Sequence, residues 1–341
     1  MPNPIFLFGF PRSGTTLVRA LLGAHSRISL VNEPELVWAL QRSGVGVADR
    51  VAPGELPELI ERLRRTRPCR EHIARNAVAL RDLCAARDAL SFREIFERLL
   101  PRPADATQIW GEKSLNDLFY TRELAALYPG CLLIHIVRDP RAVARSRAEK
   151  RSARGARAPR SALRSAWSHA SDARLWSDWM AVARAAQRAL RGARWFELRY
   201  EELLAEPVRV LRSLCTAIGV EYEQQMLDPA ARAADPVLQT QAAFAHERIS
   251  QPLDPRRAAA ARTAPAALAW IVEREAAAAM RELGYEPTRP ALPCWQTPAL
   301  RLLCFAAGRW RSGKQRAHFA QRGIGAAELS AARSALAASP G

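Results

Sequence analysis

The sequence lacks the marks of a membrane-spanning or disulfide-rich protein. Its 341 residues contain no run of about 18 uncharged apolar residues, which excludes a transmembrane helix. Its six cysteines show no CxxC or other metal-type spacing, so they are expected to be buried thiols. The N-terminus has neither a basic leader nor a cleavable apolar segment, which favours a cytoplasmic protein.

Aromatic residues are few and acidic residues are outnumbered. Aromatic residues make up 7% of the chain, and no helix-turn-helix, zinc or RNA-recognition signature is visible, so no nucleic-acid partner is expected despite a net charge of +17. That charge is mostly arginine and indicates an anionic partner, such as a nucleotide or a sulfated or phosphorylated substrate. Apolar residues at 49% are ample for a core.

The strongest pattern lies at residues 4–19, PIFLFGFPRSGTTLVR. Residues 5–10 are apolar and predict a buried strand, and apolar residues recur at helical spacing from residue 17. A strand, a glycine-containing loop and a helix N-terminus form the layout of a phosphate-binding loop, in which backbone N–H groups and the helix dipole converge on an anion. The candidate ligands are Arg12, Ser13, Gly14, Thr15 and Thr16.

Two further segments each predict a strand that ends in a charged residue. Residues 27–31 are followed by Glu33, and the apolar residues 108–111 lead to Lys113. Ligands bind outside the carboxyl ends of the strands in an open parallel sheet, so these side chains should face the same crevice as the first loop.

Residues 131–137, CLLIHIV, predict the central strand, because a continuous apolar run is typical of buried parallel strands. The strand leads to Arg138, with Asp139 as the N-cap and Pro140 in the first turn of the next helix. Ser146 follows Arg138 by eight residues on that helix.

The remaining chain predicts the layers around this sheet. Residues 36–105 indicate a helical insertion that shapes the acceptor site. A last strand is expected at 195–200, a helix broken near Pro207 at 201–218, and a final helix at 266–283 that ends at Gly284. Together these patterns predict an α/β fold, a P-loop-like three-layer α/β/α domain over 1–290 with a helical C-terminal part, and a basic tail over 291–341.

The first loop differs from the nucleoside-triphosphate P-loop at one position. Gly9, Gly14 and Thr16 match GxxxxGK[ST], but Thr15 occupies the place of the lysine that reaches the β- and γ-phosphates. Losing that charge argues against a phosphotransferase such as a kinase, which remains the alternative, ahead of a basic nucleic-acid-binding protein.

GFPRSGTT together with RDPRAVARS resembles the 3′-phosphoadenosine 5′-phosphosulfate (PAPS)-dependent sulfotransferases, most closely the branch with protein-tyrosine sulfotransferases and bacterial relatives. The resemblance implies that the first loop binds the 5′-phosphosulfate, and that Arg138 and Ser146 hold the 3′-phosphate. It extends over about residues 4–287. Its other matches are the WGDK-like residues 110–113, the YEDL-like residues 200–203, which add Tyr200 to the cofactor-binding set, and the LGY at 283–285.

The family's reaction moves the sulfuryl group of PAPS to an acceptor hydroxyl by in-line transfer. Glu33 matches the carboxylate base of the tyrosine-sulfating relatives, with Glu35 and His25 as alternatives. Arg12 and Lys113 would stabilise the charge that develops on the bridging oxygen. No metal is expected on this account.

The sequence departs from the family near the cofactor phosphates. Gln251 stands where the tyrosine-sulfating enzymes carry a lysine before proline, so that contact is expected from Arg248, Arg256 or Arg257, while His246 is ambiguous.

Partners stay open in four respects. The acceptor hydroxyl can belong to a tyrosyl peptide, a glycan, a lipid or a small metabolite, and a homodimer is compatible with the sequence. The basic residues 145–164 form either a solvated surface or an electropositive rim for the acceptor. The basic amphipathic residues 297–316 are candidates for peripheral contact with an anionic membrane or a lipid-linked substrate.

Overall fold

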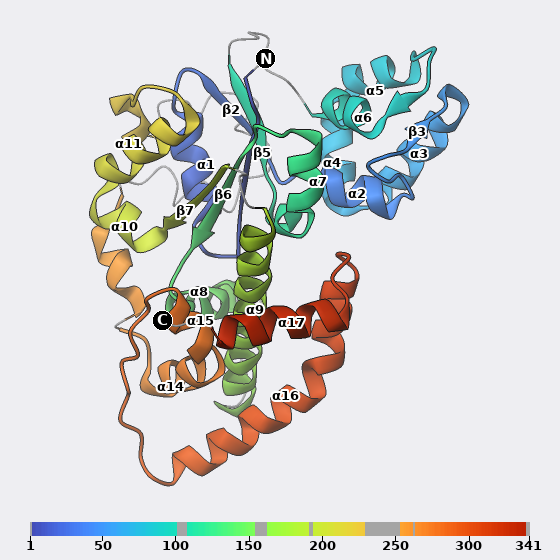
Figure 1. Cartoon of the computed structure of the whole chain (residues 1–341). Coiled ribbons are helices and arrows are strands. Elements are labelled where there is room, and N and C mark those ends of the chain that lie inside the picture. Colours follow the sequence, from blue (N-terminus) through green and yellow to red (C-terminus); the bar gives the residue numbers. More distant parts are fainter. Residues whose placement is uncertain are drawn as a thin grey trace.

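A five-stranded parallel sheet lies at the centre of the computed structural model, with strand order β2-β5-β1-β6-β7 (Figure 1). The strands are β1 (Ile5–Gly9), β2 (Ile28–Asn32), β5 (Ile109–Lys113), β6 (Leu132–Val137) and β7 (Arg194–Arg199). The structure describes residues 2–100, 108–153, 162–190, 194–228, 253–261 and 263–338.

Alternating side chains of β1 build a core on each face of the sheet. Ile5 and Leu7 pack in one cluster with α1 (Thr15–Gly23) and α11 (Pro207–Ile218). Phe6 and Phe8 pack in the other with α7 (Thr121–Leu127) and α9 (Ala162–Ala189). Helices therefore cover both faces, and the predicted three-layer α/β/α arrangement is confirmed.

The register of the sheet brings the predicted strand ends to one edge. Lys113 at the end of β5 lies between Leu7 of β1 and Asn32 of β2. The close approach of β5 to β1 depends on Gly111, because a Cβ atom there would lie 1.9 Å from the carbonyl oxygen of Ile5.

The insertion after β2 is helical, as predicted, and projects to one side of the sheet (Figure 1). It also contains a short antiparallel pair, β3 (Arg50–Val51) with β4 (Leu90–Ser91), which the sequence did not predict because two residues show no strand periodicity. The helices are α2 (Leu36–Arg42), η1 (Pro53–Glu55), α3 (Leu56–Arg64), α4 (Arg67–Arg75), α5 (Ala77–Cys84) and α6 (Phe92–Leu99). Two of these helices, α4 and α5, meet at Asn76.

The predicted βα junctions recur in the structure after β6 and β7. The helix after β7 is broken at Pro207, as expected, into α10 (Tyr200–Ala205) and α11. The other helical segments between the sheet and the C-terminal part are η2 (Leu115–Tyr120), α8 (Pro140–Ala153), η3 (Gln224–Leu227) and η5 (Pro255–Ala261).

The helix expected over 266–283 is divided at Ala276 into α14 (Ala266–Glu275) and α15 (Ala277–Glu282). It ends as predicted at Gly284, whose φ is 66°. The N–H of Gly284 donates to the carbonyl of Arg281, and that of Tyr285 to Met280, which is the Schellman pattern.

Two more helices complete the chain, α16 (Gln296–Ala320) and α17 (Ala326–Ala337). In Figure 1, α17 crosses α9, and α16 runs along the lower edge of the molecule. Arg333 of α17 forms a two-pronged ion pair with the buried Asp178 of α9, with both N–O distances 2.6 Å.

No helix in the described part of the chain combines the length and the apolar character that crossing a bilayer requires. The six cysteines all lie in described residues, and none of them forms a disulfide. Four are buried as expected. Cys84 and Cys294 are exposed, which corrects that expectation: Cys84 ends α5, and Cys294 lies in a surface segment before α16.

Candidate active site

The loop after β1 turns tightly before α1. The N–H of Ser13 donates to the carbonyl of Phe10 at 2.9 Å. The residues on either side of Ser13 have left-handed backbone conformations, with φ of 79° at Arg12 and 100° at Gly14. The α1 helix begins without a side-chain cap and without an acidic residue in its first turn. Its N-terminus is therefore suited to an anion.

Tyr200, the first residue of α10, packs directly on this loop. A Cβ atom at Gly14 would lie 2.3 Å from Cδ2 of Tyr200, and one at Gly9 would lie 2.6 Å from the carbonyl oxygen of Ile136. Gly14 is thus required both for its φ and for the space that the tyrosine ring occupies.

The side chains predicted to bind the nucleotide's two phosphate ends meet at Arg12. Its Nε donates to Oγ of Ser146 at 3.2 Å, and Arg138 Nη1 donates to the Arg12 carbonyl at 3.0 Å. The guanidinium of Arg138 lies 4.1 Å from the centre of the Tyr200 ring. Arg12 after β1 and Arg138 after β6 therefore lie together, with Ser146 of α8 and Tyr200 of α10 in contact with them.

Two buried polar atoms of this group have no hydrogen-bond partner among the described residues, namely Oγ of Ser13 and Nε of Arg138. Leaving a buried donor unpaired is costly, so their placement is suited to a polar ligand. Thr15 is buried and Thr16 is half-buried at the start of α1.

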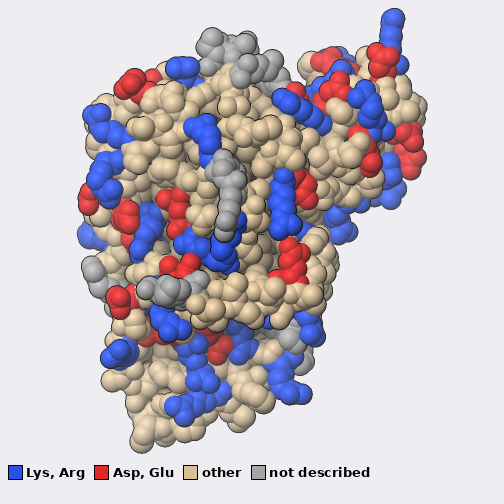
Figure 2. All heavy atoms as spheres, viewed as in Figure 1, with Lys and Arg blue, Asp and Glu red and all other residues tan. Residues whose placement is uncertain are grey.

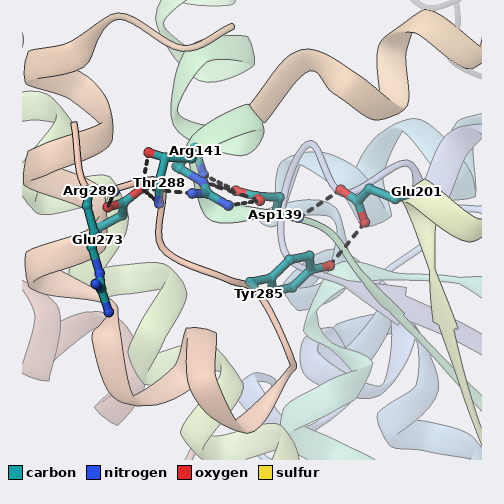
Figure 3. Close-up of polar contacts among 7 residues, drawn as sticks. All are labelled: Asp139, Arg141, Glu201, Glu273, Tyr285, Thr288 and Arg289. Atoms are coloured by element: carbon teal, nitrogen blue, oxygen red, sulfur yellow. Dashed lines mark hydrogen bonds and ion pairs between the residues drawn. The ribbon is translucent and has the colours of Figure 1, made fainter. Parts of the chain in front are cut away.

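A hydrogen-bonded frame holds the chain that follows Arg138 (Figure 3). The N–H of Asp139 donates to Oε1 of Glu201 at 3.0 Å, and the hydroxyl of Tyr285 donates to Oε2 of the same carboxylate at 3.1 Å. Burial raises the pKa of Glu201. The motifs around residues 138, 200 and 284 are thus in direct contact.

The same frame continues on the other side of Asp139. Its carboxylate accepts from the backbone N–H of Arg141 at 2.8 Å, which confirms the predicted N-cap, and also binds the Arg141 guanidinium. Arg141 in turn pairs with Glu273 at 2.7 Å, and Glu273 accepts from Thr288 and Arg289 (Figure 3). Because Asp139 is engaged by Arg141, Arg138 remains directed at the loop.

An ion pair between Glu33 and Lys113 joins the ends of β2 and β5. The Lys113 side chain is 1% exposed and that of Glu33 is 37% exposed, so the carboxylate is the accessible partner. The N–H of Glu33 donates to the Lys113 carbonyl at 2.7 Å, and Glu33 has a φ of 50°. Burial lowers the pKa of Lys113, an effect that the negative charge of Glu33 opposes.

Three carboxyl groups close to this pair are buried: Glu35, Glu112 and Asp117. Burial raises the pKa of Glu35 to about 7 and that of Glu112 to about 8. The charge of Glu33 adds to the rise at Glu35, and the charge of Glu35 adds to the rise at Glu112. Burial and the charge of Glu112 raise the pKa of Asp117. The cluster therefore retains protons near neutral pH.

Asn116 connects this cluster to the C-terminal part of the chain. Its side chain hydrogen-bonds to Glu35, and its Oδ1 accepts from Arg322 Nε at 2.6 Å. Arg322 follows α16, donates to the carbonyl of His318 at 2.7 Å and lies 5.7 Å from the Phe119 ring centre. The positive charge of Arg322 lowers the pKa of Glu35, against the larger effect of burial.

The sequence model that describes the Sulfotransferase family matches residues 4–224, about two thirds of the chain. The chain belongs to the sulfotransferase family. The match spans the loop, Lys113, Arg138 and Tyr200, whereas Glu273, Tyr285 and Arg322 lie beyond it. No curated protein matches the chain.

Two solved structures have a similar fold to this sulfotransferase. A sulfotransferase domain from the curacin biosynthetic pathway is 20% identical, with a TM-score of 0.56 over 84% of this chain and 99% of that domain. The sulfotransferase domain of the Synechococcus PCC 7002 olefin synthase is 19% identical, with a TM-score of 0.50 over 80% and 95%. The predicted P-loop-like α/β fold is confirmed.

His25 of this sulfotransferase lies at the far end of α1 from the loop. Its Nδ1 accepts from the Arg27 N–H at 3.0 Å and its Nε2 lies 2.8 Å from the carbonyl of Glu221. Both ring nitrogens thus contact backbone groups, and the ring fastens α1 to residues 221–223 instead of facing Glu33 or the loop.

Other predicted residues fall outside the site or outside the described residues. His246, Arg248 and Gln251 are among the residues not described. Arg256 is exposed and pairs with Asp254 at 3.0 Å.

In the described part of the basic segment 145–164, Arg145 pairs with Glu149, and Arg147 and Arg151 both pair with Asp172. Within the described residues, no group of three or more His, Cys, Asp or Glu side chains is arranged to hold a metal ion.

The sequence did not predict the buried acid cluster or the contact of Arg322 with Asn116. Glu112 and Asp117 lie on either side of Lys113, within the six residues 112–117. Two acids so close to a predicted buried strand were the available signal for the cluster. Arg322 had no such signal, because 206 residues separate it from Asn116.

Proposed function

We propose that this sulfotransferase moves the sulfuryl group of PAPS to an acceptor hydroxyl. The observation that carries the proposal is the meeting of Arg138 and Ser146 with Arg12 on the first loop. A phosphate-binding loop with a second cationic position beside it fits a nucleotide that carries phosphate at both its 5′ and 3′ positions. A phosphotransferase would need the lysine that Thr15 replaces.

The donor would be held by fixed charge and backbone N–H groups. The N–H groups of residues 14–16 at the start of α1 bind the 5′-phosphosulfate, and Arg12 supplies a guanidinium beside it. Arg138 and Ser146 bind the 3′-phosphate. Tyr200 packs against Gly14 and stacks on Arg138, which keeps both in place for the nucleotide.

The transfer uses Glu33 as the base, with Glu35 as the alternative. Glu33 takes the proton of the acceptor hydroxyl while the hydroxyl oxygen forms a bond to sulfur. The bond from sulfur to the bridging phosphate oxygen breaks in line, and the electron pair stays on that oxygen. Lys113 and Arg12 stabilise this negative charge. The ion pair of Glu33 with Lys113 keeps both groups at the junction of donor and acceptor.

The acceptor is a hydroxyl of a tyrosyl peptide, a glycan, a lipid or a small metabolite. The helical insertion over 36–105 lies next to Glu33 in the chain and would shape the acceptor site. A screen of these four classes with radiolabelled PAPS identifies which class is sulfated.

The experiment that tests the nucleotide assignment compares thermal shifts with 3′,5′-phosphoadenosine, AMP and ATP. The bisphosphate should raise the melting temperature most. Arg138→Ala should reduce the preference for the bisphosphate over AMP by about 10- to 100-fold, the scale of a lost charge-assisted hydrogen bond. Arg209→Ala, at an exposed ion pair on α11, is the control and should leave the preference unchanged.

Two outcomes would contradict the proposal. An Arg138→Ala variant with the full preference for the bisphosphate would remove Arg138 from the 3′-phosphate site. Equal shifts with ATP and the bisphosphate would favour a phosphotransferase.

A further inference from the structure

Exposed apolar side chains gather at one corner of the molecule. Among the described residues, the large apolar side chains with the highest exposure are Val78, Leu163, Trp295, Leu302 and Phe305. Three of these lie on α16 or directly before it, and they are 63% to 72% exposed. Leu163 lies at the start of α9, one turn before Trp167. Trp167 packs against the cluster that contains the buried residues of α16.

The orientation of α16 is fixed by its opposite face. Leu303 and Cys304 are buried against α9 and α14. Arg174 of α9 donates to the carbonyl of Cys304 at 2.7 Å, and a Cβ atom at Gly308 would lie 1.9 Å from the Arg174 guanidinium. Leu302 and Phe305 therefore face outward because the helix is held on its other side.

The same segment is basic throughout. No acidic residue occurs between Glu286 and Glu328. Figure 2 shows basic side chains interspersed with uncharged surface over the lower part of the molecule, where α16 lies in Figure 1. The exposed basic residues of α16 are Arg301, Arg309, Lys314 and Arg316. An ordinary solvated helix mixes both signs of charge, so this composition indicates an anionic partner.

We propose that this corner, the α16 surface, docks on an anionic membrane. It comprises Leu163, Trp295, Leu302, Phe305 and the four exposed basic residues of α16. Apolar and Trp side chains would enter the boundary between headgroups and acyl chains, while the basic side chains would contact lipid phosphates. The docking is independent of the proposed donor and base.

Other partners fit the α16 surface less well. A second copy of the chain on a two-fold axis would place the basic side chains of one α16 against those of the other, which is repulsive. A nucleic acid would match the charge but leave Leu302 and Phe305 in water. An anionic membrane matches both the charge and the apolar side chains.

Vesicle co-sedimentation of the full chain tests the proposal. The protein should bind phosphatidylcholine vesicles that contain phosphatidylglycerol far better than vesicles of phosphatidylcholine alone, and added salt should weaken the binding. The double variant Leu302→Ser/Phe305→Ser should bind at least tenfold more weakly, since each side chain contributes apolar burial. Arg301→Gln should weaken binding about fivefold, the effect of one cation near an anionic surface.

Val78→Ser is the matched control, because Val78 is also exposed but lies on α5 in the insertion. It should bind vesicles as the wild type does, and unchanged melting temperatures check that each variant is folded. Equal binding to neutral vesicles, or no binding at all, would overturn the proposal. So would a dimer that the double variant dissociates, or binding to duplex DNA without binding to vesicles.

Discussion

On the donor side of the site, the charge is permanent, whereas on the acceptor side it can be titrated. Arg12 and Arg138 carry guanidinium groups that stay charged at any physiological pH, and backbone N–H groups complete the donor side. The acceptor side contains Glu33 and Lys113 in front of buried carboxyl groups whose pKa values are raised into the neutral range. Nucleotide binding should therefore depend little on pH, while the acceptor side should respond to it.

The largest expected effect is a loss of turnover without a loss of nucleotide affinity. Glu33→Gln should cut turnover by about two orders of magnitude or more, because the amide cannot take the acceptor proton. The affinity for 3′,5′-phosphoadenosine should stay nearly unchanged, since Glu33 lies outside the nucleotide group. Steady-state kinetics and calorimetry measure the two quantities.

Glu58→Gln, an exposed acid on α3, serves as the control for Glu33→Gln. A Glu33→Gln enzyme with normal turnover would transfer the role of the base to Glu35. A loss of nucleotide affinity in this variant would show that the two sides are not separable.

The next effect concerns the geometry of the donor side. Gly14→Ala places a methyl group against Tyr200 at a φ of 100° and should weaken binding of 3′,5′-phosphoadenosine tenfold or more. Gly219→Ala is a matched control, because its φ is 92° but no atom lies within 4 Å of the added Cβ. Gly219→Ala should lose about 1 kcal/mol of stability from its backbone conformation alone. Gly14→Ala should lose more, because the tyrosine ring must also move, and only Gly14→Ala should lose affinity. Equal affinities in calorimetry would contradict the packing argument.

The acid cluster should make stability depend on pH. The pKa of Glu112 is raised by burial from 4.5 to about 8, so the folded state holds this proton more tightly than the unfolded chain. The stabilisation is complete below pH 4.5 and is lost as the pH rises towards 8. Glu112→Gln keeps a neutral side chain and should raise the melting temperature at pH 8 relative to the wild type by a few degrees.

The same comparison at pH 5 should show little difference between Glu112→Gln and the wild type, because both side chains are then neutral. Glu61→Gln, at an exposed ion pair, should show no such pH dependence. A wild-type melting temperature that rises between pH 5 and pH 8 in parallel with that of Glu112→Gln would contradict the assignment.

The smallest expected effect tests the link between α16 and the acceptor side. Arg322→Ala removes a positive charge that lowers the pKa of Glu35 and also frees Asn116, so the pKa of Glu35 should rise. The pH profile of turnover should shift to higher pH, with a change of a few-fold near pH 7 and unchanged nucleotide affinity. Arg316→Ala, exposed on α16, is the control. An unaltered pH profile would limit Arg322 to a packing role.

The sequence predicted what depends on short, contiguous patterns. The first loop, the strand ends at Lys113 and Arg138, the cap at Asp139 and the glycine at 284 each follow from local backbone and side-chain chemistry. All of them occur in the structure where expected. The rule that parallel strands share one ligand-binding edge predicted that Glu33 and Lys113 lie at the crevice of the first loop. The pairing of Arg138 with Ser146 was implied by the resemblance to the sulfotransferases.

The rest depended on contacts between distant segments. The burial of Glu112 and Asp117 results from the packing of β5 and η2 beneath other elements, which no local pattern reports. Arg322 reaches Asn116 only because α16 and α17 fold back on α9. The break at Ala276 has no proline or glycine to mark it, so a continuous helix was the natural expectation.

The frame around Asp139 has a consequence for how the protein is made on the ribosome. Of the two partners of Asp139, Arg141 is held by Glu273 and Glu201 is held by Tyr285. Glu273 and Tyr285 are synthesised well over a hundred residues after β6. A nascent chain that has only just exposed β6 therefore lacks the contacts that fix the β6–α8 junction. Competence to bind the donor nucleotide should appear late in translation, when the segment through residue 289 has left the exit tunnel.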